Sequence, residues 1–461
     1  MKNVKAFYNP AQLFTFSFIM IILTGCLLLM APFSTQVPIN FIDALFTATS
    51  AVCVTGLTTL DTGTAFTPIG HFIIILLIQI GGLGILTFTN YFAYFFKGAS
   101  TYENQIATSN FSNNEKLGEV FLMLKRIIII TFSIELFGAI FIFLFTAKLM
   151  DQSFLEHLFF SVFHSISSFC NAGFSVVPDG LTNPLVIHNY AFQMVLIILI
   201  IFGGLGFPIV INILKYLKHV FNRIFKKIAY REFDYKPWVI NINSKINLIT
   251  TLSITVFATI LIFILEYDNI LVTHEGIGKF VTALFTVVSP RTAGYNSIDY
   301  GALHIYSILF IILLMWIGAS PNSTGGGIKT STFAVAVLNI LSLVKGKERV
   351  EVFQREIAGI TIKRAFAIMT LSLFVIGCCI ISISVFDPEC TLVEIAFECF
   401  SAYSTVGLTL GITAKLSAGS KITLIILMFI GRVTMLTIMI AMFKKVKFTN
   451  YRYAKEELTI N

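Results

Sequence analysis

The chain has 461 residues, of which 56% are hydrophobic and only 12% are charged. So few charges cannot solvate the surface of a soluble protein of this length, and the composition therefore predicts a membrane protein surrounded by lipid. The formal charge of +8 would favour nucleic acid as a partner for a soluble protein. Here the cations are confined to alternate loops, which indicates membrane topology, so no nucleic-acid partner is expected.

The first apolar run extends from Gln12 to Met30 and follows Lys2 and Lys5, so it could be mistaken for a secretory signal. We interpret it as a spanning helix. It is longer than a typical signal core, and the APFSTQ that follows is a poor cleavage site. The seven cysteines are scattered without a CxxC pair. They indicate neither a disulfide framework nor a metal site, and we expect no covalent cofactor.

A stretch of small and hydroxyl residues around Gly56, SAVCVTGLTTLD, returns three times along the chain. SSFCNAGFSVVPD surrounds Gly173, SPRTAGYNSID surrounds Gly294, and SAYSTVGLTLGI surrounds Gly407. Each stretch follows a long apolar run and a shorter amphipathic run, and a second long apolar run comes after it. The order of helix, half-helix, hairpin and helix thus occurs four times, which suggests four-fold pseudosymmetry.

The predicted helix, half-helix and second helix of each repeat are 12–30, 40–51 and 69–96; 127–145, 154–169 and 191–214; 246–265, 277–288 and 305–343; and 365–386, 392–402 and 422–443. The half-helices are too short and too polar to span, so each is expected to enter the membrane and return. Non-helical backbone persists at membrane depth only where protein buries it or it lines a watery cavity. The sequence therefore predicts an all-α membrane protein with eight transmembrane helices and four re-entrant half-helices around a central pore.

Lysine and arginine predict the orientation and the boundaries. Both are concentrated in 215–236, in 345–364 and in the tail, which therefore lie in the cytoplasm. Both termini are then cytoplasmic, all four hairpins enter from outside, and the repeats are parallel. The expected repeats are 1–96, 127–214, 246–344 and 365–443, and the expected cytoplasmic segments are 97–126, 215–245, 345–364 and 444–461.

One glycine in each hairpin has a chemical reason. A dehydrated monovalent cation needs oxygen ligands in place of water, and rings of backbone carbonyls provide them. Aligned carbonyls require unusual dihedral angles, which glycine adopts without steric cost. The alternative is four ordinary extracellular turns. The candidate potassium-binding filter residues are Val54, Thr55, Gly56, Asn171, Ala172, Gly173, Thr292, Ala293, Gly294, Thr405, Val406 and Gly407.

The second long run of each repeat carries a further landmark: IGGLG at 80–84, FGGLG at 202–206, IGASP at 317–321 and IGRVT at 430–434. In the third repeat, proline and three consecutive glycines disfavour a continuous helix. A flexible polar loop over 318–329, below the filter, would obstruct the pore and act as a gate. The alternative is a packing kink. The candidate gate residues are Gly318, Pro321, Asn322, Ser323, Thr324, Gly325, Gly326, Gly327 and Lys329.

Three further charged residues are candidates. Arg432, at the equivalent place in the fourth repeat, would be a positive obstacle beneath the filter; the alternative is a buried pair with a carboxylate such as Glu135. Arg291, three residues before Gly294, would brace its hairpin through hydrogen bonds to carbonyls. Glu398, nine residues before Gly407, would add negative potential or stabilise its half-helix.

At these motifs the chain resembles the Trk/Ktr/HKT superfamily of potassium transporters, and most closely the Ktr-type membrane subunit. The marks are SAVCVTGLTTLDT, SPRTAGYNSID, GASPNSTGGGIK and the Gly431–Arg432 pair. The resemblance implies potassium selectivity from one filter glycine per repeat, and a gate made by the broken helix and the arginine. It also implies a homodimer on a cytosolic octameric ring of nucleotide-binding regulatory subunits, in the plasma membrane, with transport often stimulated by sodium.

Two other classes of function are alternatives to an ion transporter. A sodium-coupled solute symporter would predict inverted repeats and a substrate-sized polar site at the midplane, whereas the repeats here are parallel. A polytopic enzyme needs clustered acids, histidines or a nucleophile with a base, and the sequence shows no such cluster. We therefore expect an ion transporter and not an enzyme.

Overall fold

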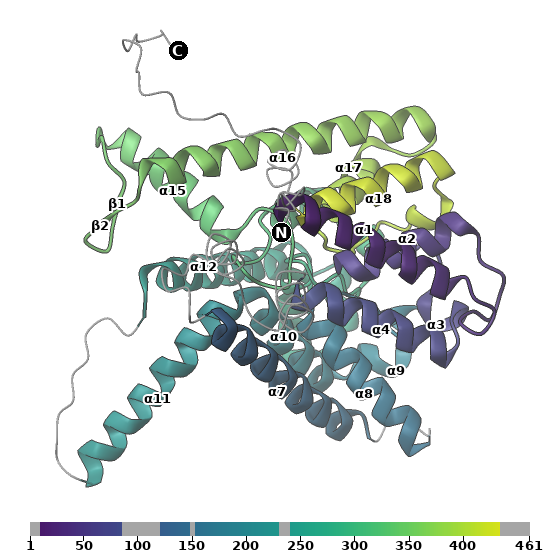
Figure 1. Ribbon diagram of the computed structural model, residues 1–461, viewed down its shortest axis with the longest axis horizontal. Helices are drawn as coiled ribbons and strands as arrows, with labels where there is room; N and C mark the ends of the chain where they lie inside the picture. Colours follow the sequence, from purple (N-terminus) through teal and green to yellow (C-terminus); the bar gives the residue numbers. More distant parts are fainter. Residues whose placement is uncertain (1–9, 85–119, 148–152, 230–239, 434–461) are drawn as a thin grey trace, which may run out of the picture.

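The computed structural model describes residues 10–84, 120–147, 153–229 and 240–433 (Figure 1). Within these ranges the chain is almost entirely helical. Its strands are one short antiparallel hairpin formed by β1 (Glu351–Val352) and β2 (Arg355–Glu356). The predicted end of the first repeat at 85–96, most of the loop at 97–126 and the tail at 444–461 lie outside the described residues.

The first segment contains α1 (Pro10–Leu29), α2 (Phe41–Cys53), α3 (Thr62–Ala65) and α4 (Pro68–Leu83). α2 is the predicted half-helix and buries nearly all of its second half. α4 begins with proline in its first turn and is capped by Thr67, whose hydroxyl accepts a hydrogen bond from the Gly70 amide.

The second segment has the same order of helices: α7 (Val120–Thr146), α8 (Phe154–Phe169), η2 (Gly180–Thr182), α9 (Pro184–Ile187), α10 (Tyr190–Leu205) and α11 (Phe207–Ala229). The half-helix α8 has the predicted boundaries because Ser153 and Glu156 form a capping box at its start.

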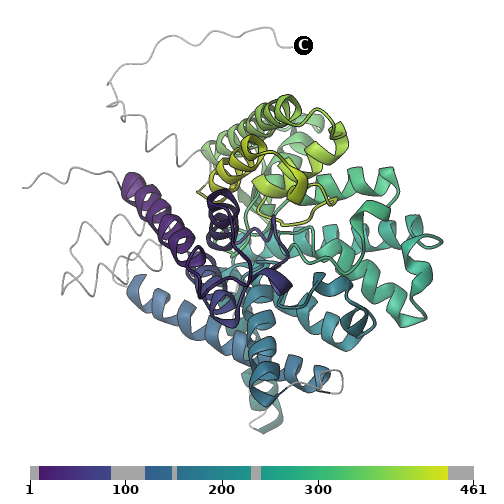
Figure 2. The ribbon, with the colours of Figure 1, turned by 90° about the vertical axis from the view of Figure 1, so that its right-hand side faces the viewer.

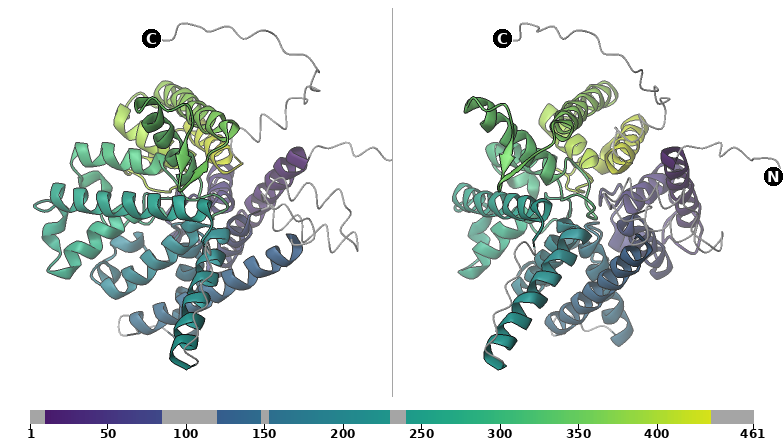
Figure 3. Two further views of the ribbon diagram at one scale, coloured as in Figure 1. Left: turned by 90° about the vertical axis from the view of Figure 1, so that its left-hand side faces the viewer. Right: turned by 60° about the vertical axis from the view of Figure 1, so that its left-hand side comes forward.

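The run predicted at 191–214 is not one continuous helix, because the chain bends by 107° between α10 and α11. Gly206 joins these helices with φ of 84°, outside the helical region. A Cβ atom at this glycine would also meet the carbonyl oxygen of Pro321 at 2.5 Å, so close packing requires glycine here. α11 therefore leaves the bundle, as both views of Figure 3 show.

The third segment contains α12 (Ile242–Leu265), η3 (Ile270–Thr273), α13 (Ile277–Val288), η4 (Tyr300–Ala302), α14 (Ile305–Trp316) and α15 (Thr330–Val344). The fourth contains α16 (Gly359–Phe386), α17 (Leu392–Tyr403), η5 (Thr413–Lys415) and α18 (Ala418–Val433). α14 and α15 are separated by a non-helical loop, at the place where the sequence predicts an interruption.

The four segments close a ring. α4 contacts α8, α10 contacts α13, α14 contacts α17, and α18 contacts α2. Each of these contacts joins the second long helix of one segment to the half-helix of the next, and the last contact joins the end of the bundle to its beginning. Figure 2 shows the segments in sequence order around the middle of the molecule. One hydrophobic cluster crosses the closing seam, with Phe46 from the first segment and Leu424 from the fourth.

Helix length and composition support a membrane location. Among the described helices, α7 over 125–146, α12 and α16 are each long and apolar enough to cross a membrane, and α10 with α11 would be a fourth candidate if the bent pair forms one span. Several shorter apolar helices accompany them, including α4 and α14. The predicted number of eight spans stays a prediction, since 85–119 and 434–461 are not described.

Candidate functional site

The four half-helices end at one kind of turn. Two residues before each predicted filter glycine, the backbone adopts a positive φ: 55° at Val54, 61° at Asn171, 75° at Thr292 and 50° at Thr405. Such angles are uncommon for non-glycine residues and are true outliers for β-branched ones, with a cost of about 1–3 kcal/mol each. Four matched outliers at one position indicate that the chain holds a required backbone geometry there.

The four predicted filter glycines lie against one another in a closed cycle. A Cβ atom on Gly56 would overlap the carbonyl oxygen of Ala172, and one on Gly173 would overlap that of Ala293. The cycle continues in the same direction. A Cβ on Gly294 would overlap the oxygen of Val406, and one on Gly407 would overlap that of Thr55. Four glycines and the carbonyls of the four preceding residues therefore alternate around the ring, and a side chain at any of the glycines would collide with backbone.

One serine near the end of each half-helix bridges its own turn. The Gly56 amide donates to the Ser50 hydroxyl at 3.0 Å, and the Gly407 amide donates to Ser401 at 3.1 Å. In the second and third turns the hydroxyl is the donor instead. Ser167 donates to the Phe174 carbonyl at 2.8 Å, and Ser289 donates to the Tyr295 carbonyl at 2.6 Å. These bonds explain why each of the four sequence stretches begins with serine.

The second sequence landmark packs directly behind these turns. Cβ atoms on Gly81, Gly203 and Gly431 would overlap the carbonyl oxygens of Val52, Phe169 and Tyr403, respectively. Each of these oxygens belongs to the residue four places before a filter glycine. Glycine in the landmark therefore lets the following helix approach the end of the half-helix. The third segment differs, because Gly318 packs against Gly326 of the loop between α14 and α15.

That loop lies next to the turns. A Cβ atom on Gly325 would overlap the hydroxyl of Thr292, and one on Gly326 would overlap the hydroxyl of Thr405. Thr324 also donates its hydroxyl hydrogen bond to the Phe169 carbonyl at 3.2 Å. The loop predicted to be a gate is thus in contact with residues of the second, third and fourth turns.

Hydrogen bonds to the second segment fix the start of the same loop. The Ser320 amide donates to the Gly204 carbonyl at 2.9 Å, and the Phe207 amide donates to the Asn322 carbonyl at 3.2 Å. The bend between α10 and α11 therefore accommodates the loop.

Two basic side chains donate hydrogen bonds to backbone oxygens of the loop. The Arg432 guanidinium donates to the backbone oxygens of Thr324 in the loop and Gly81 in α4. Lys329 donates from Nζ to the Gly325 carbonyl at 2.6 Å. Arg432 therefore connects the loop to the first and fourth segments.

Glu135 is not the partner of Arg432, so that alternative is wrong. Both carboxylate oxygens of this buried residue accept hydrogen bonds from Gln79 Nε2 at 3.1 Å.

Arg291 lies in the third turn as predicted, but its side chain makes different bonds. Its guanidinium donates to the Thr251 carbonyl at 3.3 Å and to the Thr255 hydroxyl at 3.1 Å, both in α12. It therefore ties the turn to the preceding long helix, and the expected bonds to carbonyls of its own hairpin are replaced by bonds to that helix.

Glu398 is fully buried behind the fourth turn. The hydroxyls of Thr409 and Thr413 both donate to its carboxylate. The residue therefore joins the half-helix α17 to the chain that leaves the fourth turn.

Sequence reasoning missed His164, which is fully buried in α8 and bonded to Ser175 beyond the second turn. The available signal was position, because His164 precedes Gly173 by nine residues, as Glu398 precedes Gly407.

Comparisons with known proteins identify the class. The TrkH family model, described as a cation transport protein, matches residues 5–451. The chain is 36% identical over 454 residues to Ktr system potassium uptake protein B of Bacillus subtilis, covering 98% of this chain and 96% of that protein. It is also 36% identical over 467 residues to potassium/sodium uptake protein NtpJ of Enterococcus hirae, covering 100% and 99%.

A solved structure supports the fold. The potassium transporter TrkH from Vibrio parahaemolyticus superposes with a TM-score of 0.70, covering 95% of this chain and 86% of that one at 17% identity. The proteins matched are ion-transporting membrane proteins and not enzymes. The chain belongs to the TrkH family of cation transport proteins. The family resemblance read from the motifs is therefore confirmed.

Proposed function

We propose that this chain carries potassium across the plasma membrane and that the ring of turns is its selectivity filter. The observation that carries the proposal is the closed alternation of four glycines with four backbone carbonyls. Such a ring offers neutral oxygen ligands that replace the water around a monovalent cation without holding it too tightly. The relatives named for potassium uptake support the choice of ion.

The filter consists of the three residues that end at each glycine in the cycle, from Val54–Gly56 to Thr405–Gly407. Potassium is the transported ion, bound by backbone oxygens of these residues. The positive φ two places before each glycine supports this assignment, because it is the same in all four turns. Arg291 acts as a support by tying the third turn to α12, and Glu398 by tying α17 to the chain between the fourth turn and the start of η5.

The gate is the loop from Gly318 to Lys329 together with Arg432. Its contacts with Thr292 and Thr405 support a position that closes the cytoplasmic side of the filter. The arginine stabilises this arrangement through the two carbonyls that it contacts. Opening would require these bonds to break and the glycine-rich segment to move away from the turns.

We further propose four parallel repeats with eight spans and cytoplasmic termini, on the basis of the cation-rich segments. By resemblance, the subunit would form a homodimer on a cytosolic octameric ring of nucleotide-binding subunits. Sodium is proposed as an activator. The name of the Enterococcus relative, which includes both ions, is consistent with a role for sodium. A sodium-coupled solute symporter is not favoured, since the matched relatives are named for ions.

The test is potassium uptake in cells that lack their own potassium transporters. Expression of the chain with a matching cytosolic regulatory subunit should restore growth at low external potassium. Failure of growth rescue, with the protein present in the membrane, would contradict the proposal. Parallel cells in which sodium is replaced by choline would show whether sodium stimulates uptake.

A further inference from the structure

The chain that leaves the second filter turn is anchored to its own half-helix by a histidine. His164 Nε2 lies 3.0 Å from the hydroxyl of Ser175, which is the second residue after Gly173. The same hydroxyl accepts a hydrogen bond from the Val177 amide at 3.0 Å. The histidine and the serine therefore fix both the position and the direction of the chain just beyond the filter.

The contacts of the ring define the tautomer of its neutral form. His164 Nδ1 lies 2.9 Å from the Phe160 carbonyl oxygen, which only accepts hydrogen bonds. Nδ1 must therefore carry the hydrogen. In the neutral ring Nε2 then accepts, and the Ser175 hydroxyl donates to it. Each side-chain polar atom of this buried pair has a partner in the arrangement, which is what a rigid buried network requires.

The fourth turn has the same construction with different residues. Glu398 occupies the place of His164, nine residues before the filter glycine, and Thr409 occupies the place of Ser175. The Thr409 hydroxyl donates to Glu398 and accepts from the Gly411 amide at 2.9 Å, as Ser175 does with Val177. Position, donor and acceptor thus agree between two segments that share neither side chain.

The first and third segments are built differently. Thr47 takes the equivalent place in α2, and its hydroxyl bonds back to the Asp43 carbonyl of the same helix at 2.9 Å. Phe285 occupies the equivalent place in α13, and its side chain has no polar atom. Because the glycine cycle runs through the segments in chain order, the second and fourth turns lie diagonally opposite each other.

We propose that His164 is a positioning residue for the selectivity filter, and that with Glu398 it forms a diagonal pair of anchors that keeps the ring at the width of a potassium ion. This inference rests on the proposed function. Releasing either anchor lets one turn move toward the axis, so the ring can contract around the smaller sodium ion. Loss of His164 should then lower the discrimination between potassium and sodium more than it lowers the amount of folded protein.

The test uses His164→Phe in the full chain, because phenylalanine already occupies the equivalent place in the third segment. Uptake of potassium in competition with sodium should show a preference reduced by about five-fold, the effect of one lost net hydrogen bond. Ser175→Ala should cause at least the same loss, because it removes the bond to His164 and also the bond from the Val177 amide. The double variant should lose no more than Ser175→Ala alone, because that variant already lacks the bond to His164. His164→Gln, which keeps an acceptor, should retain the wild-type preference.

The matched control is Thr47→Val, which removes the hydroxyl at the equivalent place in the first segment and should leave the preference unchanged. The inference is overturned if His164→Phe keeps the wild-type preference for potassium. It is also overturned if the losses of preference in His164→Phe and Ser175→Ala add in the double variant, or if Thr47→Val loses as much preference as His164→Phe. Should His164→Phe not fold, Ser175→Ala and His164→Gln decide alone. If the unmodified chain itself shows no preference for potassium, the proposed function fails instead.

Discussion

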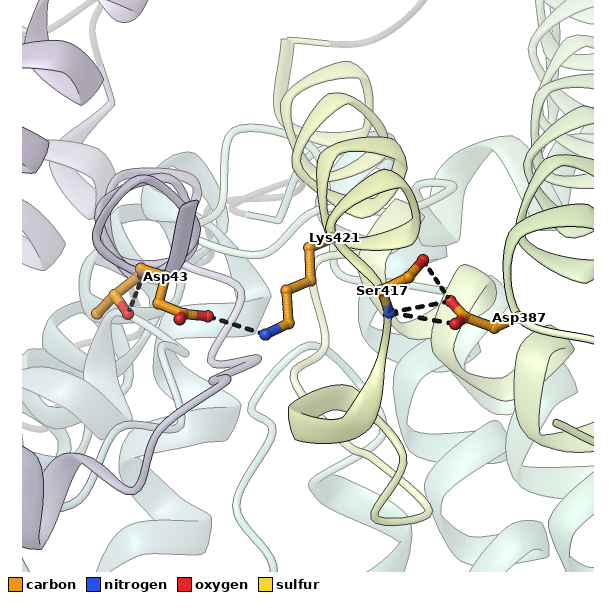
Figure 4. A network of polar contacts seen from close by, with 5 residues as sticks. Asp43, Asp387, Ser417 and Lys421 are labelled. Carbon is orange, nitrogen blue, oxygen red and sulfur yellow. Dashed lines mark hydrogen bonds and ion pairs between the residues drawn. The ribbon is translucent and has the colours of Figure 1, made fainter. Parts of the chain in front are cut away.

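The Asp43 carboxylate lies 3.0 Å from Nζ of Lys421, and this ion pair joins the half-helix of the first segment to the last long helix of the fourth (Figure 4). The two side chains are 13% and 14% exposed, so both are largely removed from water. The bond spans the seam at which the ring closes. It is therefore a contact between the two ends of the described bundle.

We predict that Lys421→Met or Asp43→Asn destabilises the protein by about 2 to 3 kcal/mol, because each leaves a mostly buried charge without its partner. Thermal unfolding of the purified protein in detergent measures the effect. The double variant should cost less than the sum of the single variants. The control is Lys347→Met, which removes an ion pair to Glu351 whose side chains are more than half exposed and should change stability by less than about 1 kcal/mol. Equal losses in control and test would contradict the prediction.

Gly56→Ser should lower the preference for potassium over sodium, because the added side chain collides with the Ala172 carbonyl in the ring. Competition between the two ions in uptake assays measures it. The matched control is Gly180→Ser. Gly180 also has a positive φ, of 63°, but a Cβ atom there meets nothing within 4 Å. This control carries the backbone strain without the collision. Unchanged selectivity in Gly56→Ser would exclude Gly56 from the filter.

Arg432→Ala should raise potassium flux by about ten-fold, the result of weakening the closed loop by about 1.4 kcal/mol. The side chain loses its bonds to Thr324 and Gly81, which connect the loop to its surroundings. Deleting part of 323–327 should also raise potassium flux. Initial rates of uptake, normalised to protein in the membrane, measure both. Arg349→Ala, in an exposed pair with Glu356, is the control for loss of a positive charge. Reduced flux at normal expression would show that Arg432 has a structural role instead.

Asp387, at the end of α16, predicts a pH dependence of stability. Burial raises the pKa of its carboxyl, but hydrogen bonds from Ser420 and Ser417 outweigh burial, so the pKa lies below the ordinary value. Figure 4 shows the contacts with Ser417. A group with a lowered pKa in the folded state stabilises the fold above its unfolded pKa, and the contribution disappears as pH falls through the folded pKa.

Asp387→Asn should therefore reduce the unfolding temperature at pH 7. The difference in unfolding temperature from the unmodified chain should become smaller below about pH 4. The free-energy difference at neutral pH should be about 1 kcal/mol. Melting curves across pH measure it, with the exposed Asp268→Asn as the control. A difference between Asp387→Asn and the unmodified chain that stays constant down to pH 3 would contradict this account.

Much of the site was predictable because its requirements are local. The half-helix boundaries follow from amphipathic spacing, and α8 and α13 have the predicted bounds; in α8 a capping box also marks the start. The position of the glycine in each turn follows from its positive φ, which few other residues adopt. The break between α14 and α15 follows from proline and glycine, which disfavour helix at any depth.

The partners of the buried polar groups could not be predicted in the same way. Arg432 donates hydrogen bonds to backbone carbonyls and not to Glu135. Arg291 bonds to α12, and His164 bonds to Ser175 beyond the second turn. A long side chain reaches atoms on several neighbouring helices, and sequence spacing does not rank them.

The sequence by itself determined a membrane protein with four glycine turns, one broken helix and the family to which the chain belongs. Only the tertiary structure decided the cyclic order of the turns, the bend at Gly206 and the diagonal placement of His164 and Glu398. The reason is physical. Helix ends and turn angles depend on residues close in the chain, whereas the ring is closed by contacts between segments more than a hundred residues apart, and these depend on how all four segments pack together.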